Sequence, residues 1–193
     1  MSRSVSPARA KTFVVAAIGD SLTDPKSGGG GYLTYLQARC PASRFDSWGK
    51  GGNMVSQMRA RFARDVLGEG GDGSRPRYTH VIFLGGIADI GSNETAGRTV
   101  AKIQVDLRAM YQMAHERGAV VIALTIPPWG KYKTYDDEKH RMMLEMNAWL
   151  RSLPERYRIT RDGRVKETTG RATIAEMLAH DPTEAPRSSM IEP

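Results

Sequence analysis

Cysteine, histidine and long apolar runs are all scarce in this chain of 193 residues. Its single cysteine, Cys40, cannot form an intramolecular disulfide, so a disulfide-stapled scaffold is excluded. Four scattered histidines and one cysteine give no ligand spacing of the zinc type, and we expect neither a metal site nor a cofactor. The longest apolar stretch, Phe13–Ile18, is too short to span a bilayer, so no transmembrane segment is expected.

The N-terminal residues 1–11 are basic and serine-rich, but no longer apolar region with a small-residue cleavage site follows them. We therefore expect a cytoplasmic protein, or an exported protein whose signal has been removed. The net charge of +7 would suit a nucleic acid or an anionic lipid surface. The arginines are spread over the whole chain and accompany no nucleic-acid-binding motif, so we expect a solvated basic surface without a specific nucleic-acid partner.

Apolar, β-rich segments alternate with helix-length segments through the first 150 residues. This alternation is typical of a parallel sheet covered by helices on both faces, and it predicts a three-layer α/β/α sandwich with a flavodoxin-like sheet. The predicted strands are 12–18, 44–48, 79–84 and 119–125, and the predicted helices are 31–39, 54–67, 95–117 and 136–153. The third helix has the clearest periodicity, and Gly118 is expected to end it.

Residues 154–193 do not continue this alternation. Asp162-Gly163 lies between two alternating segments, which predicts a hairpin over 158–168. A short helix is expected over 171–180 and a loose tail over 181–193. The expected organisation is thus a basic arm (1–11), one α/β domain (12–153) and an atypical C-terminal region (154–193), and the oligomeric state is left open.

Ser21 directly follows the first predicted strand, at the carboxyl edge of the sheet, where open α/β folds bind ligands. The glycine-rich loop 28–31 comes shortly after it. That loop lacks the Lys-Ser/Thr pair of a phosphate-binding loop, so we expect it to form the flexible rim of a pocket. Taken alone, Ser21 could be a nucleophile or a simple turn residue.

Four segments together resemble the sequence blocks of the SGNH/GDSL hydrolases, over about residues 12–153. They are 17–23 (AIGDSLT), 46–54 (DSWGKGGNM), 83–89 (FLGGIAD) and 123–129 (ALTIPPW), the last followed by a helix with NAWL at 147–150. The resemblance implies a serine esterase or acyl hydrolase without a cofactor, acting on a small ester such as an acetylated sugar or a short lipid. It implies that Ser21 is the nucleophile, and that its backbone N–H and that of Gly52 bind the oxyanion. Gly51 is the alternative to Gly52.

The chain departs from the family pattern at two places. Ala88 occupies the position of the family's asparagine, whose amide is the remaining oxyanion donor. Losing one such donor typically lowers turnover by about 100- to 1,000-fold. An alanine here is compatible with natural divergence and with a deliberate replacement.

The second departure is that no Asp-x-x-His pair of the family's kind is recognisable in the C-terminal segment. His140, with Asp137, lies at the start of a helix, and His180, with Asp181, lies near the end of the chain; both are candidate general bases. His80 and His115 are expected to be structural. The sequence therefore predicts a GDSL-type esterase whose activity is intact, impaired or lost, and the alternative is a non-catalytic binding or scaffold protein on the same fold.

Overall fold

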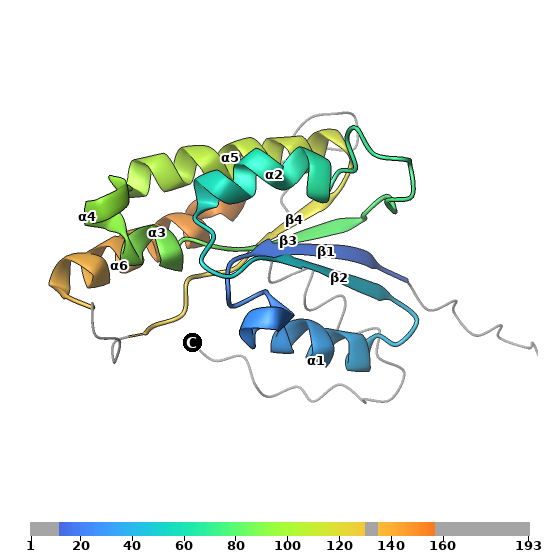
Figure 1. Ribbon diagram of the computed structural model, residues 1–193, viewed down its shortest axis with the longest axis horizontal. Helices are drawn as coiled ribbons and strands as arrows, with labels where there is room; N and C mark the ends of the chain where they lie inside the picture. Colours follow the sequence, from blue (N-terminus) through green and yellow to red (C-terminus); the bar gives the residue numbers. More distant parts are fainter. Residues whose placement is uncertain (1–11, 130–134, 157–193) are drawn as a thin grey trace, which may run out of the picture.

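The computed structural model describes residues 12–129 and 135–156 (Figure 1). Strands and helices alternate as expected. The strands are β1 (Val14–Gly19), β2 (Arg44–Gly49), β3 (His80–Leu84) and β4 (Val120–Ala123). The helices are α1 (Gly31–Arg39), α2 (Val55–Asp65), α3 (Ile87–Gly91), α4 (Asn93–Ala96), α5 (Val100–Glu116) and α6 (Asp137–Arg156), and a short 3₁₀ turn, η1 (Pro25–Ser27), precedes α1.

The described strands form one parallel sheet in the order β2-β1-β3-β4. The chain winds outward from β1 in both directions, which is the flavodoxin-like order that the alternation of strands and helices predicts. β1 and β3 are buried along almost their whole length, and their continuous apolar sequences suit strands that are covered on both faces.

Helices cover both faces of this sheet, which confirms the three-layer sandwich. Figure 1 shows α1 below the sheet and α2 and α5 above it. On the α1 side, Leu33 and Leu36 pack against Val15, Ala17 and Ile82. The opposite side holds the larger core, in which residues of α2, α5 and α6 such as Phe62, Met110 and Met146 are fully buried or nearly so.

The predicted helix 95–117 is wrong in its first turn. Residues Asn93–Ala96 form the separate helix α4, and α5 begins only at Val100. The break lies at Gly97, which adopts a left-handed conformation with φ of 56° and ends α4, after which the Thr99 side chain caps α5. Gly118, with φ of 74°, follows the end of α5, as expected.

The short helix α3 was not predicted. The basic arm, the C-terminal hairpin, the last helix and the tail lie outside the described residues. Within residues 12–129 and 135–156, no helix combines the length and apolar character that crossing a membrane requires.

Candidate active site

The three sequence blocks meet because of the register of the strands. Gly19 at the end of β1 pairs with Gly49 of β2 on one side and with Leu84 of β3 on the other. The three strands therefore end at the same level, and the segments that follow them emerge side by side. These segments carry Ser21, Gly52 and Ala88, respectively.

Ser21 lies half-buried in a tight turn directly after β1. The Asp20 carbonyl accepts hydrogen bonds from the backbone N–H groups of Thr23 and Asp24, and the Asp20 Oδ1 accepts one from the N–H of Leu22 at 2.9 Å. Three N–H groups of the turn are thus satisfied by the one residue before Ser21, which fixes the backbone on both sides of the serine.

Glycine is required next to this turn for steric reasons. A Cβ on Gly19 would come within 2.2 Å of Thr23 Oγ1 and 2.6 Å of the Leu84 carbonyl oxygen. A Cβ on Gly29, in the glycine-rich loop, would lie 2.1 Å from the Ser21 carbonyl oxygen. The loop 28–31 therefore packs against the backbone of the Ser21 turn.

Asp24 joins the Ser21 turn to the loop after β2. Its Oδ2 accepts the backbone N–H of Gly51 at 3.0 Å and the hydroxyl of Ser27 at 2.8 Å. Ser47, near the end of β2, adds a second link to the Ser21 turn, since its hydroxyl donates to the Thr23 carbonyl at 2.7 Å. The loops after β1 and β2 are thus held together as one unit.

Gly52 lies in this second loop, is exposed, and has a φ of 70°. A Cβ at this position would meet no atom within 4 Å, so the backbone faces open space on that side. A neighbouring contact stabilises the loop: Arg61, from α2, donates to the Asn53 Oδ1 at 2.9 Å and to the Gly19 carbonyl at 3.2 Å.

Ala88 lies half-buried in the first turn of α3, and the residue after it anchors the third block. Asp89 is fully buried; its Oδ2 accepts the N–H of Val55 at the start of α2 at 2.8 Å. Its Oδ1 accepts Arg98 Nε at 2.6 Å, and Arg98 also donates to Asp106 at 2.7 Å. The carboxylate thereby connects α3 to the helix that follows the Gly52 loop.

Two buried carboxyl groups lie beneath the edge that carries Ser21. Burial raises the pKa of Asp20 to about 6, and the nearby charge of Asp89 adds to this effect. Burial also raises the pKa of Asp89, although the hydrogen bonds from Val55 and Arg98 oppose the shift. Within the described part of the chain, Asp20 Oδ2 has no hydrogen-bond partner. Burial thus makes both carboxyl groups weaker acids than an exposed aspartate.

The structure describes three of the four histidines, and two of these, His80 and His115, lie away from the edge that carries Ser21. His140 is exposed in the first turn of α6, where its Nδ1 forms a hydrogen bond with the Tyr135 hydroxyl. In Figure 1, α6 begins beyond α3 and α4, whereas the Ser21 turn leads into α1. His80 begins β3 at the opposite edge, and His115 lies in the last turn of α5. His180 lies outside the described residues.

The sequence of residues 17–163 matches the family model of the GDSL-like lipase/acylhydrolase family. The chain belongs to this family. The match includes all three blocks at the carboxyl edge of the sheet, and it extends beyond α6. The family and its structural relatives support an esterase-type hydrolase. No curated protein sequence matches the chain significantly.

Solved structures of GDSL-like and related hydrolases share the fold. The acetylxylan esterase Axe2 from Geobacillus stearothermophilus is 20% identical, with a TM-score of 0.62, and the match covers 92% of this chain and 97% of Axe2. The α/β hydrolase LAE5 from the metagenome of Lake Arreo is 21% identical, with a TM-score of 0.58 and coverage of 88% and 94%. A GDSL-like lipase from Bacteroides thetaiotaomicron is 15% identical, with a TM-score of 0.57 and coverage of 86% and 85%.

Sequence reasoning placed Ser21, Gly52 and Ala88 on adjoining segments, but it missed the residues that hold these segments together. Asp24, Asp89 and Arg98 were not singled out. Asp89 stands next to Ala88 in the third block, so its place in the motif was a signal. No signal in the sequence pointed to Arg98, because nothing in its local sequence indicates which carboxylate it pairs with.

Proposed function

We propose that this chain is a serine esterase of small carboxylic esters in which Ser21 is the nucleophile. The observation that carries the proposal is the common level at which β1, β2 and β3 end, because it brings the Ser21 turn and the Gly51-Gly52 loop together. Asp24 and Ser47 hold these two segments in contact.

In the proposed reaction the Ser21 hydroxyl attacks the ester carbonyl and transfers its proton to a general base. The backbone N–H groups of Ser21 and Gly52 then donate to the developing oxyanion. Collapse of the tetrahedral intermediate releases the alcohol, which takes up a proton, and leaves an acyl group on Ser21. Attack by water regenerates the hydroxyl and releases the carboxylic acid. The candidate bases are His140 and His180.

The substrate class to test first is an acetylated carbohydrate. Axe2, described as an acetylxylan esterase, shares the fold over most of both chains. The alanine at position 88 leaves the oxyanion with fewer donors than the family pattern provides, so we expect slow turnover. This same residue favours the second candidate, a binding protein that retains the fold and the pocket without chemistry.

Labelling with a fluorophosphonate distinguishes the two candidates, because the reagent reacts only with an activated serine. We expect intact-mass analysis to find one adduct on this chain and none on a Ser21→Ala variant. His140→Ala and His180→Ala variants then identify the base, since labelling should slow strongly in one of them. Absence of labelling on the folded chain, together with no hydrolysis of p-nitrophenyl acetate, would contradict the esterase and favour the binding protein.

A further inference from the structure

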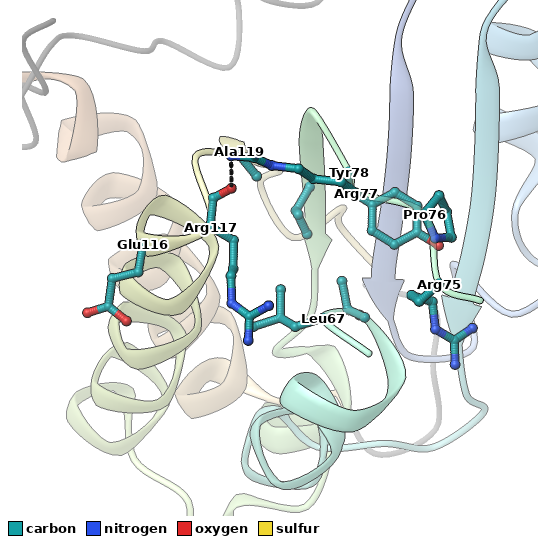
Figure 2. Close-up of a pocket in the computed structure, with 10 residues that line it drawn as sticks. Leu67, Arg75, Pro76, Arg77, Tyr78, Glu116, Arg117 and Ala119 are labelled. Carbon is teal, nitrogen blue, oxygen red and sulfur yellow. Dashed lines mark hydrogen bonds between the residues drawn. The ribbon is translucent and has the colours of Figure 1, made fainter. Parts of the chain in front are cut away.

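A pocket of about 400 Å³ lies at the amino edge of the sheet, away from Ser21. Three segments line it: the end of α2, the chain that leads into β3, and the end of α5. Figure 2 shows the side chains of these segments around the hollow. Its lining residues are Val66, Leu67, Arg75, Pro76, Arg77, Tyr78, Val81, Glu116, Arg117 and Ala119.

The inner wall of the pocket is apolar. Val66 and Val81 are fully buried, and Tyr78 and Ala119 are nearly so. The Tyr78 hydroxyl already forms two hydrogen bonds within the protein: it donates to Asp46 at 2.8 Å and accepts from the Trp48 indole at 3.0 Å. The wall therefore offers a surface for an apolar or aromatic body rather than for a sugar or another strongly hydrated group.

Three arginines, Arg75, Arg77 and Arg117, line the pocket beside this apolar wall, and in Figure 2 the Arg75 guanidinium points away from the other labelled residues. Arg77 reaches the end of α5, where it donates to the carbonyl oxygen of Arg117 at 3.3 Å. Arg117 pairs with Glu69 at 2.6 Å, but both side chains are about half exposed, so this pair is weak and open to exchange. In Figure 2, the Arg117 guanidinium lies between α5 and Leu67, whereas Glu116 points away from the other labelled residues.

Arg75 is the third arginine that lines the pocket. Its guanidinium carbon lies 4.0 Å from the centre of the Trp48 ring, which fixes the side chain by cation–π stacking. Its Nε is buried and has no hydrogen-bond partner in the part of the chain that the structure describes. Because this Nε has almost no exposed surface, an anion in the pocket would bind through the terminal nitrogens of the guanidinium rather than through Nε.

We propose that this pocket is a second binding site, distinct from the Ser21 edge, for a small organic anion with an apolar or aromatic body. Arg75, Arg77 and Arg117 outnumber Glu116 and Glu69, so the charge around the pocket favours an anion. Guanidinium groups bind carboxylate, sulfonate and phosphate oxygens through paired hydrogen bonds. Since a cavity of about 150 Å³ holds a benzene molecule, this pocket has room for a body of about two rings.

A fluorescent probe of this class tests the proposal. We expect 8-anilinonaphthalene-1-sulfonate to bind the native, full-length chain saturably at a single site. N-phenyl-1-naphthylamine, which has the same rings without the sulfonate, should bind at least about tenfold more weakly, because a hydrogen-bonded charge contributes that much to affinity. Added salt should weaken binding of the sulfonate and leave that of the uncharged probe unchanged.

Variants locate the site. Arg77→Gln and Arg117→Gln should each raise the dissociation constant of the sulfonate by about tenfold. Arg141→Gln removes the same charge from an exposed position on α6 and should leave it unchanged. Energy transfer from tryptophan to the bound probe should fall in Trp48→Phe and persist in Trp129→Phe, because Trp48 lies beneath Arg75. Circular dichroism checks that each variant is folded.

If an arginine variant does not fold, Leu67→Trp provides the test instead, since a larger side chain at the wall should fill the pocket and abolish binding. Equal binding of the two probes would overturn the proposal, as would undiminished binding to the variants or no saturable binding at all. None of these measurements depends on ester hydrolysis, so the proposal can fail while the proposed function stands, or the reverse.

Discussion

Replacement of Arg98 by leucine removes the cation that neutralises the buried carboxylate of Asp89. Arg98 Nε and Asp89 Oδ1 lie 2.6 Å apart, and the two side chains are 11% and 0% exposed. Leucine keeps much of the apolar stem but leaves Asp89 with only the N–H of Val55. Asp106 is less affected, because Arg59 still pairs with it at 3.0 Å.

The expected loss of stability follows from this burial. Removing one partner of a buried ion pair typically costs about 3–5 kcal/mol, because the remaining charge stays buried without compensation. For a chain of this size each kcal/mol lowers Tm by about 2–4 °C, so we expect Tm to fall by about 6–20 °C. The loss should be smaller at about pH 5 than at about pH 8, since protonation of Asp89 removes the uncompensated charge.

Differential scanning calorimetry at both pH values measures the effect. Arg64→Leu is the matched control, because Arg64 also pairs with a carboxylate, Asp65, at 2.7 Å, but is 74% exposed. We expect its Tm to change by at most about 2 °C. If Arg98→Leu changed Tm as little as the control does, burial of the Asp89 pair would not determine its contribution, and the reasoning would be refuted.

Other expectations concern the edge that carries Ser21. Since burial raises the pKa of Asp20 from 3.8 to about 6, the folded state binds the proton more tightly, and stability should fall by about 3 kcal/mol as the pH rises through that interval. Urea unfolding across this range should show a clearly smaller fall in Asp20→Asn than in the wild-type chain, where Asp89 contributes the remainder. Ala88→Asn should raise Ser21-dependent hydrolysis of p-nitrophenyl acetate by about 100- to 1,000-fold, and no increase would contradict the role assigned to position 88. Gly49→Ala should destabilise the chain far more than Gly52→Ala, because its Cβ would lie 2.2 Å from the Asp24 nitrogen. At Gly52 only the positive φ opposes a side chain, at about 1–2 kcal/mol; equal changes in Tm would argue against the close approach of the two loops.

The sheet could be predicted because its strands are apolar runs separated by helix-length segments. The helix α1 was predicted with its observed bounds, and the predicted ends of the strands lie within two residues of the observed ones. The helix α3 escaped prediction because five residues are too few to show a helical period, and it begins after Gly86, whose φ is 117°. The division between α4 and α5 depends on the conformation of Gly97, which the apolar periodicity of the segment does not reveal.

The candidate site was predictable only in part. Ser21, Gly52 and Ala88 could be grouped because the carboxyl ends of neighbouring parallel strands share one edge. The contacts that hold them could not, because Asp89 and Arg98 meet through two short helices and a left-handed glycine. The roles of Ser21 and Gly52 remain predictions. The general base also remains a prediction: His140 contacts Tyr135, and His180 lies outside the described residues.

The strand order also has a consequence for the order of events during synthesis. β1 is synthesised early, and its partner β3 follows much later. The contacts between β1 and the segment at the start of β3, such as the hydrogen bond from the Val14 N–H to the Thr79 hydroxyl, join residues 65 positions apart in the sequence. A ribosome that has released only β1, α1 and β2 has exposed a strand with one unpaired edge and an uncovered apolar face. We therefore expect the nascent chain to need shielding from aggregation until β3 leaves the exit tunnel.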